Sequence, residues 1–473
     1  MTLPGALTIL MLSVATVADA QWTQFRGPNG SGVGTTGAYP VEFSPTKNVA
    51  WKAAVPFGQS SPVVSGSRLF VTGSEGNTLV VLAFDAQSGK QVWRREIVRD
   101  RQHKLYKAND PASPTPIADD LGVVAFFPDF GLVAYDADGG ERWRYVLGPF
   151  RNFYGMASSP VAVGERIVLV CDQQAGSFMV ALDRKSGKVA WRTERPENTV
   201  GWATPIVFRP SSGPPQLVVL GSTRVDGYDL ATGQARWWFP VASNGGLGTP
   251  VVSGDTVLVS TLASSEPFLP DFGSMVAKYD RDANNMISVE EFKADDYAEH
   301  FGWIDDNDDG TLNRAEWDAA RGVGVGDFGA VAVRPGTAIG RLAPTAFLWR
   351  FQKNLPFVPA PLVYQDVFYM IRDGGIITSL DVATGKLLKE GRSRGALGEY
   401  YASPVAADGK VFLVSAEGKV TVLRAGGQWE LLGVNELGDE VHATPALSDG
   451  LIYVRTRSTL YAFAAAPAGP GSK

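Results

Sequence analysis

The chain contains few of the residues on which most catalytic sites depend. Among its 473 residues there are one cysteine and three histidines. A single cysteine, Cys171, excludes an internal disulfide, a vicinal cysteine pair and the Cys-x-x-Cys-His heme motif. It lies in the apolar run 167–171, which predicts an inert buried thiol. The fold must therefore be held together by non-covalent contacts alone.

Charge of either sign and long hydrophobic runs are also scarce. Lys and Arg number 43 and Asp and Glu 49, which gives a formal charge of −6. Such a chain has no basic footprint for nucleic acid. The longest apolar run, residues 6–15, is too short for a comfortable membrane span. We therefore expect neither nucleic-acid binding nor a membrane-spanning segment.

Residues 1–20 resemble a signal peptide. The apolar run is followed by Ala18-Asp19-Ala20, an Ala-x-Ala cleavage site, although no Lys or Arg precedes it. We expect an exported protein, periplasmic or secreted. No cysteine follows the cleavage point, so a lipid anchor is not expected.

The main positive feature is a unit that occurs eight times. Each copy opens on a small residue followed by proline, and most copies then reach an Asp, a Gly turn and a Trp. The openings are at Ser61, Thr115, Ser159, Thr204, Thr249, Ala360, Ser403 and Thr444. They are 54, 44, 45, 45, 111, 43 and 41 residues apart, so the period is nearly regular once an insertion is removed from the long interval. Such a period is typical of a propeller or solenoid.

Each unit contains four predicted β-strands. In the first copy, an apolar hairpin over 63–73 precedes two further strands joined by a turn that contains Asp85 and Gly89. Asp and Gly supply the hydrogen bond and the positive φ that a tight turn requires. The last copy lacks its fourth strand, while the segment 48–55 carries Trp51 in the outer-strand position without the other three. We predict that this segment closes the ring and leaves no open sheet edge.

The unit Leu-Asp-x-x-(Ser/Thr)-Gly-Lys-x-x-Trp resembles the repeat of the pyrroloquinoline-quinone (PQQ) type β-propellers. These include quinoprotein alcohol dehydrogenases and the propeller lipoprotein of the bacterial outer-membrane assembly machine. The resemblance implies an all-β, eight-bladed propeller of four-stranded antiparallel blades. The segment 21–30 is similar to the N-terminus of many exported bacterial proteins of this group. The repeat indicates a fold and not a chemistry, and we interpret its Trp residues as packing between neighbouring blades.

The predicted organisation interrupts the propeller once. It begins with a signal peptide (1–20) and an N-terminal extension (21–47). The first part of the propeller (48–262) contains the closing strand (48–55), blades one to four and the beginning of blade five. An insertion (263–328), the end of blade five together with blades six to eight (329–467), and a tail (468–473) follow. The insertion falls between the expected second and third strands of blade five.

The insertion contains two matches to the EF-hand calcium loop, which begin at Asp280 and Asp305. Ca²⁺ takes about seven oxygen ligands from positions 1, 3, 5, 7, 9 and 12 of such a loop. The predicted ligands are Asp280, Asp282, Asn284, the Met286 carbonyl, Ser288 and Glu291, and Asp305, Asn307, Asp309, the Thr311 carbonyl, Asn313 and Glu316. Asn285 replaces the usual Gly, so we expect weakened binding at the first loop. The alternative interpretation is a solvated acidic loop with fortuitous spacing.

The spacing of the two loops limits what can lie between them. Only residues 292–304 separate them, about 20 Å of helix, so we predict one shared helix or two very short ones, and a helix over 315–321 that ends at Gly322. Apolar Ile287 and Leu312 predict a short β-bridge between the loops. The predicted small core comprises Phe292, Tyr297, Phe301 and Trp303. A core this small favours a structural Ca²⁺ over a sensor role.

The loops that precede the innermost strands converge on the central channel, where propellers usually bind ligands. They hold Gln59, Asn109, Asp110, Arg151, Asn152, Tyr154, Trp202, Asn244, Glu399, Tyr400, Tyr401, Glu440 and His442. Within this set we take Arg151, Asn152, Tyr154, Trp202, Glu399, Tyr400 and His442 as the candidate ligand residues. The set suits a small-molecule pocket and equally a polar rim that plugs the channel. A lone channel histidine is more often structural than a base, so no catalytic residue is assigned.

Two functions from different classes remain. The first is a binding or scaffold module that holds structural Ca²⁺ and a protein, small-molecule or carbohydrate ligand at a propeller face, and the absence of catalytic constellations favours it. The alternative is a PQQ-dependent oxidoreductase of alcohols or sugars, with the quinone in the channel. Resemblance to the dehydrogenases implies adjacent cysteines that stack on the quinone, and one cysteine cannot supply them, although some PQQ enzymes lack that pair.

Overall fold

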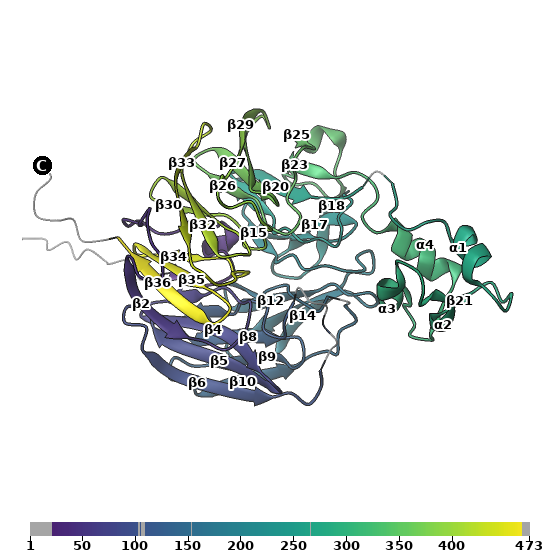
Figure 1. Ribbon diagram of the computed structural model, residues 1–473, viewed down its shortest axis with the longest axis horizontal. Helices are drawn as coiled ribbons and strands as arrows, with labels where there is room; N and C mark the ends of the chain where they lie inside the picture. Colours follow the sequence, from purple (N-terminus) through teal and green to yellow (C-terminus); the bar gives the residue numbers. More distant parts are fainter. Residues whose placement is uncertain (1–20, 103–104, 106–108, 153, 265, 466–473) are drawn as a thin grey trace, which may run out of the picture.

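The protein is an eight-bladed β-propeller with a small helical lobe at its edge (Figure 1). The computed structural model describes residues 21–102, 105, 109–152, 154–264 and 266–465. The predicted signal peptide and His103 lie outside these residues. Within them, no helix has the length and apolar character that a bilayer crossing requires. The predicted fold class is confirmed.

Each blade is an antiparallel sheet that runs from the channel outward. Blade one consists of β3 (Val63–Ser65), β4 (Arg68–Glu75), β5 (Thr78–Asp85) and β6 (Gln91–Val98), and blade two of β7 (Ile117–Asp119), β8 (Gly122–Phe127), β9 (Gly131–Tyr135) and β10 (Glu141–Val146). Blade three consists of β11 (Val161–Val163), β12 (Arg166–Cys171), β13 (Phe178–Asp183) and β14 (Val189–Glu194), and blade four of β15 (Ile206–Phe208), β16 (Gln216–Leu220), β17 (Arg224–Asp229) and β18 (Ala235–Pro240). Blade five consists of β19 (Val251–Ser253), β20 (Thr256–Thr261), β23 (Gly329–Val333) and β25 (Phe347–Phe351), and blade six of β26 (Leu362–Tyr364), β27 (Val367–Arg372), β28 (Ile376–Asp381) and β29 (Leu387–Arg392). Blade seven consists of β30 (Val405–Ala407), β31 (Lys410–Val414), β32 (Lys419–Arg424) and β33 (Glu430–Glu436), and blade eight of β34 (Ala446–Ser448), β35 (Leu451–Arg455), β36 (Thr459–Ala464) and β2 (Val49–Ala54).

The middle strands of the blades are buried on both faces because each sheet packs between two neighbours. Every residue of β8 and β9 is buried, and the sequence of these strands is accordingly a continuous apolar run rather than an alternating one. The outer strands are half exposed, as in β10. The core is therefore a series of apolar layers between blades.

The ring is closed by the two ends of the chain. β2 pairs antiparallel with β36, with Trp51 opposite Ala462. The predicted closure is confirmed, and it supplies the fourth strand of blade eight.

The repeat tryptophans join one blade to the next, as we interpreted them. Four of them donate the indole N–H to a carbonyl in the Asp-Gly turn of the following blade, and in these four pairs the turn glycine packs against the ring. The N···O distances are 2.9 Å for Trp51 to Ala86, 2.9 Å for Trp93 to Ala137, 3.1 Å for Trp143 to Arg184 and 3.0 Å for Trp349 to Val382. A Cβ on Gly187 would lie 2.6 Å from the Trp143 ring. The turn therefore needs glycine for the contact as well as for its positive φ.

A second set of bonds joins the blades close to the axis. At the opening of a repeat, the backbone N–H donates to the Ser or Thr hydroxyl that opens the next one. The N···O distances are 3.0 Å for Ser61 to Thr115, 2.9 Å for Thr115 to Ser159, 3.0 Å for Ser159 to Thr204, 3.0 Å for Ala360 to Ser403, 3.0 Å for Ser403 to Thr444 and 3.0 Å for Thr444 to Ser61. We call these residues the hydroxyl ring. The hydroxyl residue at six of the eight openings thus has a structural reason.

The N-terminal segment 21–34, which we call the N-terminal plug, crosses the channel. Its β1 (Gln21–Trp22) pairs with β3, and after the turn η1 (Pro28–Gly30) the segment bonds to Ala406 of blade seven. Between these points, the side chain of Asn29 both donates to and accepts from the backbone of Val207 in blade four. Sequence analysis identified this segment only as an extension.

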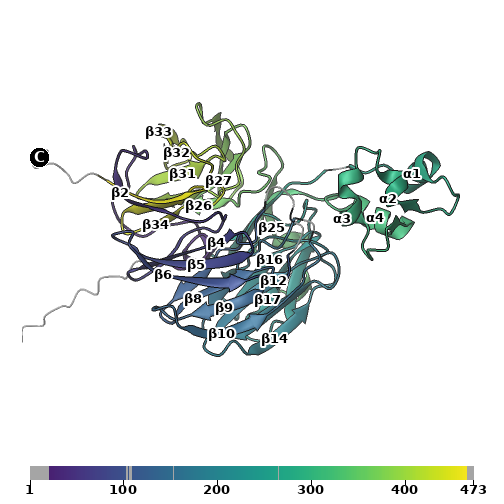
Figure 2. The same cartoon turned by 60° about the horizontal axis from the view of Figure 1, so that its bottom comes forward.

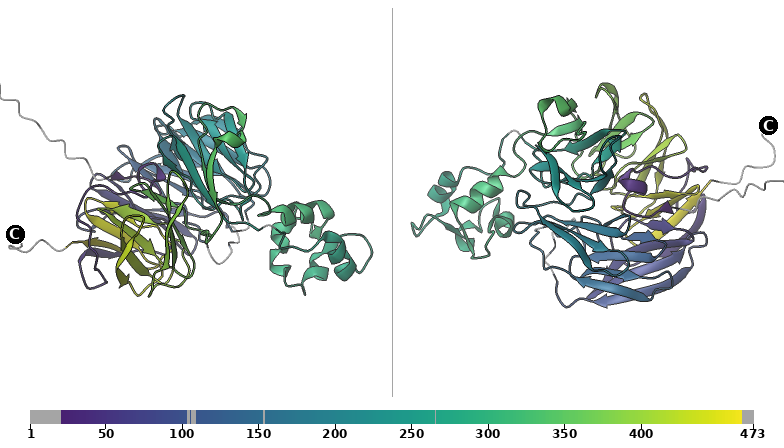
Figure 3. Two further views of the ribbon diagram at one scale, coloured as in Figure 1. Left: turned by 90° about the horizontal axis from the view of Figure 1, so that it is seen from above. Right: turned by 180° about the vertical axis from the view of Figure 1, so that it is seen from behind.

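The lobe is inserted between β20 and β23, the second and third strands of blade five, as predicted. It consists of α1 (Phe272–Tyr279), β21 (Ile287–Ser288), α2 (Val289–Phe292), η2 (Ala298–His300), α3 (Phe301–Ile304), β22 (Thr311–Leu312) and α4 (Arg314–Gly322). Ile287 pairs with Leu312, which confirms the predicted bridge, and α2 and α3 are the two very short helices. The lobe projects from the ring edge with α3 on the side of the propeller (Figure 2; Figure 3).

The small core of the lobe differs in part from the prediction. Phe292 and Phe301 are buried in it, but Tyr297 and Trp303 only pack against its edge. Their expected places are taken by Phe272 and Trp317. The reason is α1, a helix that lies before the first loop and that sequence analysis did not assign. Trp303 is consequently free to face the propeller.

The contact between the Asp-Gly turn and tryptophan can be tested with a matched pair of variants. Gly187 and Gly164 both have positive φ, 68° and 57°, but a Cβ on Gly164 would meet nothing within 4 Å. We expect Gly164→Ala to cost about 1 kcal/mol of unfolding free energy through backbone strain. Gly187→Ala should cost about 2 kcal/mol more, because Trp143 must move. Urea unfolding measures both costs, and equal costs would contradict a role for the ring contact.

Candidate functional site

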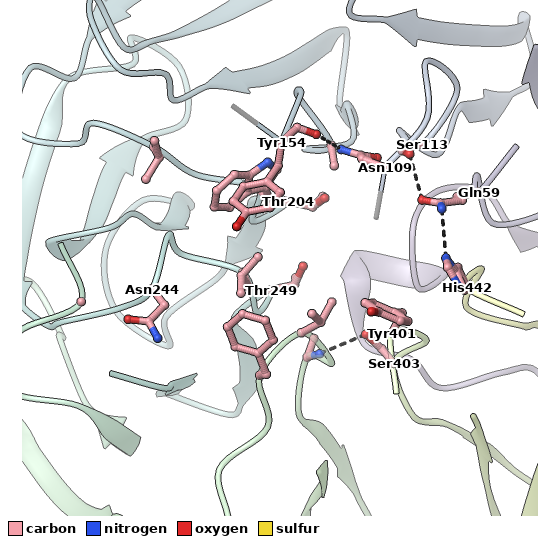
Figure 4. Close-up of a pocket in the computed structure, with 18 of the residues that line it drawn as sticks. Gln59, Asn109, Ser113, Tyr154, Thr204, Asn244, Thr249, Tyr401, Ser403 and His442 are labelled. Atoms are coloured by element: carbon pink, nitrogen blue, oxygen red, sulfur yellow. Dashed lines mark hydrogen bonds between the residues drawn. The ribbon is translucent and has the colours of Figure 1, made fainter. Parts of the chain in front are cut away.

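The channel contains a cavity of about 630 Å³ between the propeller and the lobe (Figure 4). The hydroxyl ring forms part of its wall, and Phe25 of the N-terminal plug contributes a ring to the lining. Its aromatic lining comprises Phe25, Tyr154, Trp202, Phe268, Trp303, Phe357 and Tyr401, with His300 and His442. Among the described lining residues there is no Lys or Arg, and Glu266 is the sole carboxylate.

A chain of hydrogen bonds runs along the part of the cavity wall that blades eight, one and two form. The Ser113 hydroxyl donates to Gln59 Oε1 at 3.1 Å, and Gln59 Nε2 donates to His442 Nδ1 at 2.9 Å (Figure 4). Because His442 accepts at Nδ1, its proton lies on Nε2. The ring of Tyr401 packs on the imidazole with centroids 4.6 Å apart.

Burial determines the ionisation of the titratable groups in this chain of hydrogen bonds. It lowers the pKa of His442 below 6.5, and the positive charge of Arg457 lowers this pKa further. The negative charges of Glu440, Asp110 and Glu399 raise it, but burial has the larger effect. Burial also raises the pKa of Asp110, which lies at the other end of the chain. His442 is therefore a neutral imidazole at pH 7.

Three of the seven candidate ligand residues line the cavity: Tyr154, Trp202 and His442. Trp202 is held by its indole N–H, which donates to the Gly155 carbonyl at 2.7 Å, and by Tyr154, which packs edge-on at 5.6 Å. Gln59, Asn109, Asn244 and Tyr401 from the wider channel set also line it.

The other four candidates do not line the cavity, and each has a partner elsewhere. Asn152 is buried and donates to the Asp172 carbonyl at 3.3 Å. Tyr400 is buried and donates to the Ala396 carbonyl at 2.7 Å, while Glu399 accepts from Tyr401 at 3.0 Å. Arg151 pairs with Asp308 of the lobe at 3.2 Å. Position in a channel loop did not reveal which way these side chains point.

The sequence analysis also missed lining residues. Phe268, His300 and Trp303 come from the lobe, and Phe25 from the N-terminal plug. Nothing in a single sequence places these segments over the channel. The hydroxyl ring was visible in the sequence as the repeat openings, but it was taken only as a marker of the period.

The lobe contacts blade three at two points. Gln174 Nε2 donates to the Trp303 carbonyl at 2.8 Å, and Arg151 pairs with Asp308. Asp308 lies in the second acidic loop, between two predicted ligands. These contacts hold the aromatic side chains of the lobe against the cavity.

The two acidic loops adopt the same conformation. In each, the amides of the fifth and sixth residues donate to the carboxylate of the first: Asn284 and Asn285 to Asp280, and Asp309 and Gly310 to Asp305. The sixth residues, Asn285 and Gly310, have φ of 59° and 80°. Asn285 thus adopts the left-handed conformation for which EF-hands use glycine.

Both loops contain carboxylates at predicted ligand positions. In the first, oxygens of Asp280, Asp282 and Glu291 lie within 4.8 Å of one another. Backbone amides of Arg281 and Ser288, together with the Ser288 hydroxyl, lower the pKa of Glu291 to about 2. In the second, the buried Oε1 of Glu316 has no hydrogen-bond partner among the described residues. Ionised carboxylates aimed into a loop, one with an orphaned oxygen, fit a hard cation.

The single cysteine has the properties predicted for it. Cys171 is fully buried in β12, and burial raises its thiol pKa well above the ordinary value. It is not a nucleophile at neutral pH.

Comparison with known proteins gives the family. The family described as Outer membrane protein assembly factor BamB matches residues 33–177, 81–269 and 298–467, most of the chain. The chain belongs to the BamB family. BamB of Burkholderia pseudomallei (strain K96243) is 29% identical over 253 residues, which are 50% of this chain and 60% of that protein. The chain thus spans about 60% of the length of this curated relative.

Solved structures agree with the BamB fold. BamB from Moraxella catarrhalis superposes with a TM-score of 0.54 at 12% identity, covering 88% of this chain and 99% of that one. Quinohemoprotein alcohol dehydrogenase from Comamonas testosteroni gives 0.52 at 13% identity, covering 96% and 82%. These identities establish the propeller alone. The BamB family matches leave out residues 270–297, so α1 and the first acidic loop lie outside the family pattern.

The state of His442 in this BamB-family chain predicts a pH dependence. Its folded pKa is lower than its unfolded value of about 6.5, so the unfolded chain binds more protons between the two values. The stability that the neutral imidazole confers is present above pH 6.5 and falls as the pH drops below it. Histidine NMR titration, assigned with His442→Gln, should give a pKa below 6.5 and a proton on Nε2. A pKa above 6.5 would contradict the assignment.

Proposed function

We propose that this BamB-family propeller is an exported, envelope-located binding module that holds a protein partner at a propeller face. The family match over most of the ring carries this proposal, because the relatives that it identifies are named for outer membrane protein assembly. The described lining of the cavity has no cysteine or lysine side chain, and the single thiol of the chain is buried elsewhere. A scaffold needs neither.

A second part of the proposal concerns the lobe, which binds two Ca²⁺ in a structural role. The ligands would be the twelve residues predicted from the sequence, with Glu291 and Glu316 each giving both oxygens. The shared conformation of the two loops and the orphaned oxygen of Glu316 support this assignment. The lobe has a small core, and an ion that binds only the folded lobe stabilises it.

Calcium binding gives a direct test. Calorimetry of the metal-free chain should show about two sites, and Ca²⁺ should raise the unfolding temperature of the lobe. Glu291→Gln and Glu316→Gln should each remove one site, because the bidentate ligand of that loop is lost. Glu290→Gln is the matched control, since Glu290 is exposed and pairs with Lys293. Equal loss with Glu290→Gln, or no heat of binding, would refute the assignment.

The residues of the cavity do not fit PQQ. PQQ carries three carboxylates, and the described lining has no Lys or Arg to pair with them. The single cysteine cannot form the disulfide ring that stacks on the quinone in the resembling dehydrogenases. An oxidoreductase is therefore not proposed.

The two function classes can be separated in one set of measurements. Crosslinking in the envelope followed by affinity purification should recover a protein of outer-membrane assembly, identified by mass spectrometry. Purified chain incubated with PQQ should show neither a bound chromophore nor dye-linked oxidation of alcohols or sugars. Recovery of the chain alone, together with PQQ-dependent oxidation, would reverse the conclusion.

A further inference from the structure

We propose that the cavity is a second binding site, which takes an uncharged, largely apolar ring compound carrying one hydrogen-bond-accepting oxygen. This site is separate from the proposed protein-binding role. Its volume of about 630 Å³ lies in the range of small-molecule sites. The propeller builds one wall, and the lobe builds another with Phe268 and Trp303.

The charges of the lining favour an uncharged ligand. The described lining has no Lys or Arg, and its one carboxylate, Glu266, is exposed. An anion that left water here would find no cationic side chain of the described lining to replace its hydration, and a cation would find only the solvent-exposed carboxylate of Glu266. An uncharged ligand loses little on entry.

The hydrogen bonds already present leave few amide groups of the lining for a polyhydroxylated ligand. Both polar ends of the Gln59 amide are engaged, by Ser113 and His442. Both ends of the Asn109 amide are engaged too, by the Tyr154 carbonyl and the Asp110 amide. A sugar must have its hydroxyls paired, and these two amides cannot serve them. The aromatic lining, in contrast, suits an apolar ring.

His442 supplies a free donor beside the aromatic lining. Its Nδ1 accepts from Gln59, so Nε2 carries the proton, and no described residue bonds to Nε2. The imidazole lines the cavity and packs against the tilted ring of Tyr401 (Figure 4). An oxygen on an otherwise apolar ligand, such as an aromatic ketone, would accept this hydrogen bond.

The test uses the full chain in calcium-containing buffer with the uncharged fluorescent probe N-phenyl-1-naphthylamine. We expect saturable binding of one probe per chain. Phe268→Ala should weaken the probe about tenfold, because a lining ring is lost. Phe57→Ala is the matched control: Phe57 is 40% exposed, Phe268 is 49% exposed, and Phe57 does not line the cavity. Unfolding temperatures confirm that both variants are folded.

Competition defines the ligand class. 2-Acetylnaphthalene should displace the probe about fivefold better than 2-ethylnaphthalene, as expected for one net hydrogen bond, and His442→Phe should abolish that preference. No saturable binding, equal effects of the two phenylalanine variants, displacement by maltose, or a ketone preference that survives His442→Phe would each overturn the proposal.

Discussion

Eight separate sheets must meet in a closed circle, and the rest of the structure depends on how that circle is joined. Two sets of contacts join it at different radii. Near the axis the hydroxyl ring links repeat openings through backbone amides. Farther out, tryptophans bond to the next Asp-Gly turn. With no disulfide possible, these joints and the pairing of β2 with β36 hold the ends of a 473-residue chain together.

The joints are weakest where the chain departs from its repeat. Ala360 has no hydroxyl, so it offers no acceptor to the opening of blade five. Trp237 of blade four bonds within its own blade, to Gln216 at 2.5 Å, and β24 (Gly340–Arg341) adds beside it as a parallel strand. The lobe enters at blade five, between β20 and β23. A hairpin at the end of a blade can accept an insertion because its tip lies outside the packed layers between blades.

A ring of eight blades leaves a channel that the innermost strands cannot fill. The N-terminal plug crosses it, anchored in part by Arg26, which is fully buried and donates to the Pro361 carbonyl at 2.6 Å. The lobe projects from the ring edge, contributes Phe268, His300 and Trp303 to the cavity, and contacts blade three through Arg151 and Gln174. The cavity thus has contributions from segments far apart in the sequence, and its polar amides are largely engaged with one another. Its aromatic faces and the imidazole N–H of His442 are among the groups that remain free for a ligand.

The sequence by itself determined the blades, the closing strand, the inserted loops and the bridge between Ile287 and Leu312. These features are local or periodic, and they leave a pattern of turn residues and alternating apolar positions. Only the tertiary structure decided that Trp303 leaves the lobe core to face the channel, that Arg151 turns to Asp308, and that the segment 21–34 crosses the axis. Such choices depend on which distant surfaces meet once the ring has closed, and a repeat records the packing of neighbouring blades without recording what lies across the channel.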